Sequence, residues 1–178
     1  MSDGTQLRRP TGQATRGVEI PGVLLGFLDR ATVAVCATRD GQLVPRIRYV
    51  CGWRVEPGNR ILRCAIQDRG LVGLEESLRD NREFAVAIEE IGPHETYQFK
   101  GEVVELVPCD EQDRAVADAA RAKFTRSLSS YYSLPDSTSR AYFGEPGRTA
   151  RVAVREIFVQ TPGPGAGVRL VPPPEVLP

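Results

Sequence analysis

The feature that most constrains the fold is a long alternation of apolar and polar residues at 43–66, interrupted by turn residues at 56–59. Alternation with a period of two is typical of a β-strand with one buried face. The apolar positions of the first half are Leu43, Pro45, Ile47, Tyr49, Cys51, Trp53 and Val55. The opposite positions carry Arg46, Arg48 and Arg54. We therefore expect an antiparallel sheet packed on a core, with three arginines that need water or a bound anion.

The length of the chain and the composition of its ends predict one folded domain with two irregular ends. A chain of 178 residues without an internal repeat is enough for a single core. We expect a flexible arm at 1–17, a folded domain at 18–160 and a tail rich in proline and glycine at 161–178. The tail is either solvated or laid over a partner subunit.

The charge balance argues against a nucleic-acid or membrane partner. Lysine plus arginine and aspartate plus glutamate both total 23, so the formal net charge is zero and any basic site must be local. The longest apolar run, 23–28, is far too short to cross a bilayer, and the polar N-terminus has no signal-peptide core. These features predict a soluble, cytoplasmic protein.

The cysteine pattern favours buried thiols over a metal centre. The four cysteines, at 36, 51, 64 and 109, have no Cys-x-x-Cys spacing and only one histidine accompanies them. Three of them fall inside predicted strands, where a free cysteine serves as a small hydrophobe. We therefore expect neither a zinc site nor a disulfide framework.

The rest of the chain predicts a mainly β fold with flanking helices. Strands are expected at 32–38, 84–88, 96–107 and 151–160, and helices at about 20–30, from about 71 to 81, and onward from Asp110 as the N-cap. Asp40-Gly41 predicts a tight hairpin turn, and Gly101 a bulge or a close backbone approach. A short helical turn should begin near Pro135. The total is about six antiparallel strands.

The order of these elements, with four short motifs, resembles the pyridoxamine 5′-phosphate oxidase-like family, whose fold is the FMN-binding split β-barrel. The motifs are Ala34-Val35-Cys36-Ala37-Thr38-Arg39-Asp40-Gly41, Pro45-Arg46-Ile47-Arg48, Leu78-Arg79-Asp80-Asn81-Arg82 followed by Phe84-Ala85-Val86, and Tyr97-Gln98-Phe99-Lys100-Gly101. The resemblance covers about 20–107. It rests on the order of the motifs, since none is specific alone.

The resemblance implies a homodimer that binds FMN in a groove between its subunits and transfers hydride or electrons to or from a small organic substrate. Arg48 would hold the flavin phosphate, with Arg46 and Arg69 as further cations. The residues that would border the flavin are Cys64, Ala65, Ile66 and Gln67. Gln98 and Lys100 would face the substrate.

Departures from the family pattern favour an alternative, a haem-binding or cofactor-free split-barrel protein without redox activity. Leu74 stands where many members have a lysine, and Ala65 and Val72 replace common hydroxyl residues. His94 is either an exposed turn residue or a proton donor or axial haem ligand. Its spacing identifies no acidic partner, and no nucleophile with a credible base is present, so hydrolase chemistry is not favoured.

Overall fold

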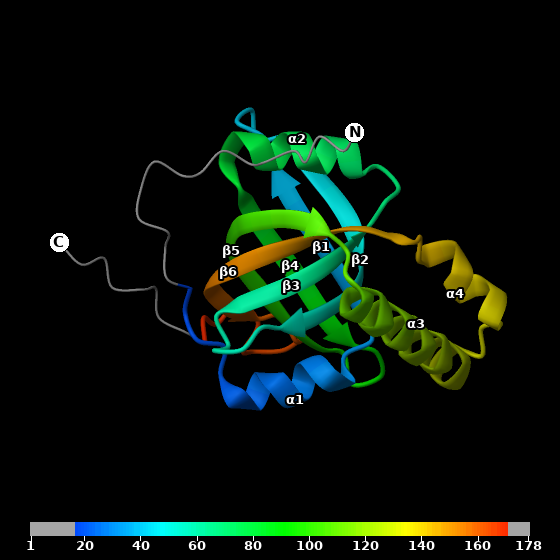
Figure 1. The fold of residues 1–178 in the computed structure, drawn as a ribbon. Helices are drawn as coiled ribbons and strands as arrows, with labels where there is room; N and C mark the ends of the chain where they lie inside the picture. Colours follow the sequence, from blue (N-terminus) through cyan, green and yellow to red (C-terminus); the bar gives the residue numbers. More distant parts are fainter. Residues whose placement is uncertain (1–16, 171–178) are drawn as a thin grey trace.

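The computed structural model describes residues 17–170, apart from the side chains at 140 and 141. The positions 1–16 of the predicted arm and 171–178 of the predicted tail lie outside the described residues. The elements, shown in Figure 1, are α1 Gly22–Arg30, β1 Val33–Arg39, β2 Pro45–Val55, β3 Ile61–Gln67, α2 Leu71–Asn81, β4 Glu83–Glu90, β5 Glu95–Pro108, α3 Glu111–Tyr132, α4 Asp136–Tyr142 and β6 Pro146–Val159.

The strands form one closed antiparallel barrel in the order β1-β2-β3-β6-β5-β4, with β4 pairing back to β1. This confirms the predicted mainly β fold with six antiparallel strands and flanking helices. Closure leaves the barrel interior as the main core, because alternate side chains of every strand point inward. The strand residues of this core include Cys36, Val50, Cys64, Val86, Phe99 and Val152, all fully buried.

Two helices close the ends of the barrel, as Figure 1 shows. The apolar residues Leu24, Phe27 and Leu28 of α1 are buried in the main core. Leu74 and Leu78 of α2 are fully buried in the same core. In each helix these residues are three or four positions apart, which places them on one face. The amphipathic helices predicted near 20–30 and 71–81 are therefore confirmed.

A bulge in β2 changes which side chains share a face. The pairing of β2 with β3 shifts register between Val50 and Gly52, so the alternation is broken there. Before the shift, Val50 points into the barrel and Tyr49 points outward to the rings of Tyr142 in α4 and of Phe143 after it. After it, Trp53 points inward, where its Nε1 donates to the Leu28 carbonyl at 3.0 Å. The prediction of one continuous apolar face carrying both aromatic residues was wrong.

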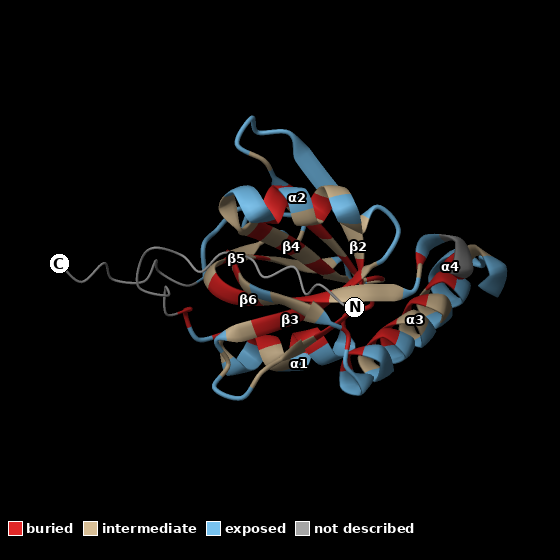
Figure 2. Ribbon diagram, turned by 45° about the horizontal axis from the view of Figure 1, so that its top comes forward, coloured by how far each residue is buried: buried red, intermediate tan, exposed pale blue. Residues whose placement is uncertain are grey.

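The hairpin between β1 and β2 differs from the predicted tight turn. Its loop spans 40–44, and the residue in the left-handed region is Leu43, with φ 65°, rather than Gly41. The Asp40 carboxylate accepts hydrogen bonds from the backbone N–H groups of Gln42 and Val44 at 3.0 and 2.9 Å. This side-chain bonding organises a wider loop than an Asp-Gly turn needs. Figure 2 shows the exposed loop and the start of β2 projecting past α2.

Gly101 lies both at a bulge and in close contact with another backbone, the two alternatives that were predicted for it. The register of β5 against β6 shifts between Lys100 and Gly101, which is a bulge. A Cβ atom at Gly101 would lie 2.1 Å from the carbonyl oxygen of Ala153. Since that oxygen belongs to the backbone of the neighbouring strand, it cannot move aside at little cost.

Helix α3 lies against the outer face of β2 and builds a second, smaller core (Figure 1). Asp110 is its N-cap, in a capping box with Asp113, which confirms the predicted helix start. Gly52 allows close contact, because a Cβ there would lie 2.6 Å from the Ala117 backbone nitrogen. The second core consists of Cys51, Ile91, Ala117, Phe124, Leu128 and Phe143.

Four charged residues fasten the start of α3 to the barrel; we call Arg54, Arg63, Asp110 and Asp113 the α3 clamp. The Asp113 carboxylate is 2% exposed and accepts hydrogen bonds from Arg54 Nε at 2.9 Å and Arg63 Nε at 3.0 Å. Burial alone would raise the pKa of Asp113, but hydrogen bonds from Arg63, Thr149 and Arg54 hold that pKa well below its usual range. Arg54 thus points away from the barrel interior and is tied to α3.

The described part of the tail folds back beside β6. The backbone N–H of Leu170 donates to the Ile157 carbonyl at 2.8 Å, and a single β-bridge joins Arg169 to Phe158. Residues 161–170 otherwise form turns and bends. A role of the tail on a partner subunit stays a prediction.

The four thiols give a prediction about chemical reactivity. Cys36, Cys51, Cys64 and Cys109 are all unpaired and buried. Burial raises the pKa of Cys36 and of Cys51 to about 12, and it also raises the pKa of Cys64 and of Cys109. Because the thiolate is the reactive form, none of the four should react with a thiol reagent in the native protein at neutral pH. All should react in denaturant, as counted by mass spectrometry; rapid labelling of any one in the native protein would contradict the burial.

Candidate functional site

Arg48 is held at the end of the barrel that α2 closes, which is the first half of the predicted site. Its Nε and Nη2 atoms donate to the Gly70 carbonyl at 2.9 and 2.7 Å, and its Nη1 donates to the Ile47 carbonyl. A guanidinium group has five N–H donors, so two remain available. The contacts orient this side chain without neutralising its charge, because carbonyl groups are uncharged.

Gly70 is the residue that sequence reasoning missed. It has φ 72°, in the left-handed region, and a Cβ there would lie 2.3 Å from Arg48 Nη2. Only glycine accepts both this backbone conformation and the close approach of the arginine without strain. The signal in the sequence was a glycine directly before the helical pattern that starts at Leu71.

The N-terminus of α2 adds positive potential to the same corner. Gly70 is its N-cap and offers no side-chain hydrogen bond, and its first turn contains no acidic residue. The unpaired N–H groups of a helix start carry a partial positive charge that favours anions. The Arg46 side chain lies beside the first turn of α2, because a Cβ at Gly73 would be 3.5 Å from Arg46 Nε. We call Arg46, Arg48, Gly70 and the first turn of α2 the Arg48 corner.

The residues predicted to border a flavin lie mostly inside the protein. Cys64 and Ile66 are fully buried in the barrel interior, and Ala65 is 2% exposed on the other face of β3. Only Gln67, at the end of β3, is partly exposed. Side chains at 64–66 therefore line no surface, because β3 is a central strand with α3 and the core on its two sides.

Arg69 was predicted as a further cation, and Leu74 was the main departure from the family pattern. Arg69 is exposed in the turn that joins β3 to α2, next to the Arg48 corner. Leu74, where many family members have a lysine, is fully buried in the main core. A lysine at this position of the present chain would be buried without a partner, so leucine is the residue that this packing requires.

Gln98 and Lys100 make the second half of the predicted site, on the outer face of β5. Lys100 Nζ lies 4.6 Å from the centre of the Phe158 ring. Lys100 also lines a pocket of about 350 Å³ whose walls include Ala37, Leu43 and Arg155. Neither Arg46 nor Arg48 lines this pocket. Within the described part of one chain, the two halves therefore form separate surfaces.

His94 has an acidic partner that its sequence spacing did not identify. It lies in the β4–β5 turn with φ 56°, and its Nδ1 is 2.8 Å from Glu89 Oε1. The side chain is 53% exposed. A carboxylate on Nδ1 orients the ring and leaves Nε2 pointing away from Glu89. Sequence spacing did not identify this partner, because the turn after β4 brings the two side chains together.

Neither a metal centre nor a membrane-spanning helix is found between residues 17 and 170. Within that range no group of three or more histidine, cysteine, aspartate or glutamate side chains is arranged to hold a metal ion. None of the helices described there has both the length and the apolar character needed to cross a membrane.

Comparison with solved structures identifies the architecture. HupZ from Group A Streptococcus superposes with a TM-score of 0.51 at 15% sequence identity, over 84% of this chain and 99% of that one. The chain has the split-barrel fold. Other split-barrel neighbours include a pyridoxamine 5′-phosphate oxidase-related, FMN-binding protein from Nostoc punctiforme, with a TM-score of 0.42 at 12% identity over 75% and 76% of the two chains.

A third split-barrel neighbour is an FMN-binding protein from Syntrophomonas wolfei, with a TM-score of 0.42 at 10% identity over 76% and 88% of the two chains. No protein-family model and no curated protein matches the sequence. At these identities the likeness establishes the split barrel and leaves the function to be argued from this chain's own residues.

Proposed function

We propose that this split barrel binds FMN and acts as an oxidoreductase on a small organic substrate, with the phosphate of FMN at the Arg48 corner. The observation that carries the proposal is the orientation of Arg48. Two carbonyl contacts direct its guanidinium toward the start of α2, where two spare N–H donors and the helix terminus favour the same anion.

The residues of this corner fit a phosphate group. Phosphate oxygens accept hydrogen bonds from a guanidinium and from backbone N–H groups, and both are present here without an acidic residue in the first turn of α2. Gln67 at the end of β3 is the predicted ring contact that is partly exposed. When bound, FMN would supply hydride or electron transfer, while the residues of the chain bind and orient it.

A homodimer is part of this proposal, because one chain keeps the two predicted halves apart. A second copy could place its Gln98 and Lys100 opposite the Arg48 corner of the first. The exposed start of β2 offers a surface for such contact, with Leu43 67% and Ile47 57% exposed. Exposed apolar residues on a projecting strand are typical of an interaction surface.

The proposal predicts that the Arg48→Ala substitution weakens FMN binding by about ten- to a hundredfold, the value of one or two charge-assisted hydrogen bonds. The affinity for riboflavin, which lacks the phosphate, should change little. The measurement is titration of the purified protein with each flavin, followed by visible absorbance and flavin fluorescence. The control is Arg79→Ala. Arg79 lies in the last turn of α2 and is paired with Glu75, so its loss should leave both affinities unchanged.

Two outcomes would count against the flavin proposal. Equal losses for FMN and riboflavin would show that Arg48 does not contact the phosphate. A wild-type protein that takes up no flavin at all would exclude the oxidoreductase function.

The alternative function, haem binding without redox activity, is favoured by the contact between His94 and Glu89. A histidine whose Nδ1 contacts a carboxylate presents Nε2 as a ligand with a fixed ring orientation. The same absorbance experiment with haem in place of flavin tests it. A Soret band that is lost in the His94→Ala variant would support haem binding, and an unchanged band in that variant would exclude His94 as the ligand.

A further inference from the structure

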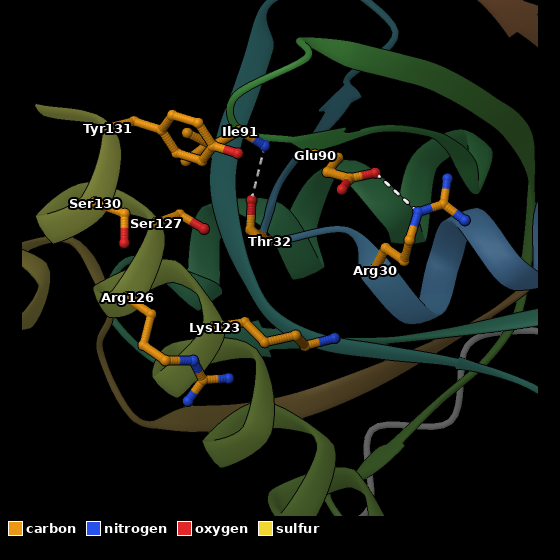
Figure 3. Close-up of a pocket in the computed structure, with 9 residues that line it drawn as sticks. All are labelled: Arg30, Thr32, Glu90, Ile91, Lys123, Arg126, Ser127, Ser130 and Tyr131. Atoms are coloured by element: carbon orange, nitrogen blue, oxygen red, sulfur yellow. Dashed lines mark hydrogen bonds and ion pairs between the residues drawn. The ribbon is translucent and has the colours of Figure 1, made fainter.

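A second polar pocket lies between α3, the end of α1 and the β4–β5 turn, away from the Arg48 corner. It has a volume of about 270 Å³. Figure 3 shows side chains of α3 along one side, Thr32 and Ile91 opposite them, and the ion pair of Arg30 with Glu90 at one end. We call this hollow the α3 pocket.

The side chains that α3 contributes share one helical face. Lys123, Arg126, Ser127 and Ser130 are spaced at i, i+3, i+4 and i+7, which places them in a row along the helix. This row is separate from the residues that α3 buries against the barrel, such as Phe124 and Leu128. The row therefore presents two cations and two hydroxyl groups to the pocket.

The two ends of the pocket differ in how their charges are paired. Arg30 is paired with Glu90 at 3.1 Å and with Glu95 at 3.0 Å, so this end of the pocket holds two carboxylates for one cation and is net negative. In contrast, neither Lys123 nor Arg126 forms an ion pair with any residue in the described range 17–170. Lys123 Nζ donates instead to the Asp29 backbone carbonyl at 2.7 Å.

The charge of Lys123 is destabilised by its surroundings. Burial lowers the pKa of Lys123, the Asp29 carboxylate partly offsets this, and the positive charge of Arg126 lowers it further. A bound anion would relieve both the desolvation and the like-charge repulsion. An anionic group is therefore favoured beside Lys123 and Arg126, on the α3 side of the pocket, and disfavoured at the Glu90 end.

The opposite wall is fixed and cannot swing in to fill the pocket. Thr32 Oγ1 accepts the Ile91 N–H at 3.0 Å and donates to the Glu89 carbonyl at 3.3 Å. The Tyr131 ring packs on Gly92, where a Cβ would lie 2.4 Å from Tyr131 Cζ. The wall formed by Thr32 and Ile91 is therefore fixed, and the Tyr131 ring of α3 rests on the β4–β5 turn at the edge of the pocket.

We propose that the α3 pocket binds a phosphate monoester of a short polyol. Lys123 and Arg126 neutralise the phosphate, whose charge is about −1.5 to −2 at neutral pH, and Ser127 and Ser130 donate hydrogen bonds to it. A volume of about 270 Å³ is more than a bare phosphate ion fills. The remaining space, bordered by the Glu90 carboxylate, suits a small chain whose hydroxyl groups can donate to that carboxylate.

The test is calorimetric titration of the full-length protein at low ionic strength with glycerol 3-phosphate, inorganic phosphate and glycerol. Glycerol 3-phosphate should bind at least about tenfold more tightly than inorganic phosphate, and glycerol should not bind. Lys123→Gln and Arg126→Gln should each weaken the binding of glycerol 3-phosphate by about tenfold, because each removes one charge-assisted contact. Arg126 is exposed, so the second variant should fold normally.

Arg114→Gln removes an exposed cation from the same helix outside the pocket and should leave the affinity unchanged. Failure of the wild type to bind glycerol 3-phosphate, equal affinity for the bare ion, or equal losses in the Arg114→Gln variant would each overturn the proposal. FMN binding should be unchanged in the Arg126→Gln variant, and glycerol 3-phosphate binding unchanged in Arg48→Ala. The two proposals can therefore fail independently.

Discussion

Replacing Asp113 by alanine is expected to lower the free energy of unfolding by about 3 to 5 kcal/mol, the effect of removing one partner of a buried ion pair. The Asp113 carboxylate accepts hydrogen bonds from Arg54, Arg63 and the Thr149 hydroxyl, which lies 2.8 Å away. Arg63 is itself 8% exposed, so alanine would leave a buried guanidinium with fewer acceptors. The loss should release the start of α3 from the barrel.

Urea denaturation followed by far-UV circular dichroism measures this effect. Asp118→Ala, which removes an exposed carboxylate from the same helix, is the matched control and should change stability by less than about 0.5 kcal/mol. Equal stability of the Asp113→Ala variant and the wild type would show that the α3 clamp contributes nothing to folding.

The α3 clamp also determines a dependence of stability on pH. The folded-state pKa of Asp113 is lowered, so its contribution is fully present above the unfolded-state pKa of about 3.9 and is lost as the pH falls toward the folded-state value. The wild type should therefore lose stability in acid below about pH 4 more steeply than Asp113→Ala. Parallel stability curves for the two proteins in this range would contradict the assignment.

Replacing Gly101 by alanine is expected to lower the free energy of unfolding by about 1 to 3 kcal/mol, the usual cost of forcing a methyl group into a packed interior. The obstacle is the Ala153 backbone carbonyl at 2.1 Å from the added Cβ, which belongs to the paired strand β6. The strands would have to separate at the bulge, where the register already shifts.

Gly26→Ala provides a control with the opposite expected sign. Gly26 lies inside α1, and an added Cβ would approach only the flexible end of Arg30, at 3.7 Å. Alanine favours a helix over glycine by about 1 kcal/mol, so this variant should be more stable than the wild type. Thermal and urea unfolding of the two variants would test both expectations. If Gly101→Ala has the same free energy of unfolding as the wild type, the backbone at the bulge can move to accommodate a methyl group.

Local patterns predicted the elements of this protein with good accuracy. Asp110 was recognised as the N-cap of the long helix, and the spacing of Leu74 and Leu78 predicted the buried face of α2. Both follow from interactions within a few residues, namely side-chain capping and helical periodicity. Gly101 was recognised because a glycine inside a strand often marks a bulge or a close approach of another backbone.

The main errors came from a single inserted residue and from contacts between distant segments. The bulge at β2 reversed the alternation after Val50, and the glycine at its end, Gly52, was not recognised as its mark in the sequence. It separates Arg54, which pairs with Asp113 from 59 positions away, from Arg48. Cys64 and Ile66 of β3 point into the barrel interior, and the role predicted for this strand beside a flavin stays a prediction.

Residue types and their spacing predicted most of the secondary structure, the mainly β class and the arginines that need an anion or water, because these depend on residue type and period. Only contacts between distant segments show where each arginine points, that Gly70 orients Arg48, that Glu89 contacts His94, and that Lys123 and Arg126 face a hollow. These depend on barrel closure and on one bulge, which bring together residues far apart in the chain and set the side that each presents.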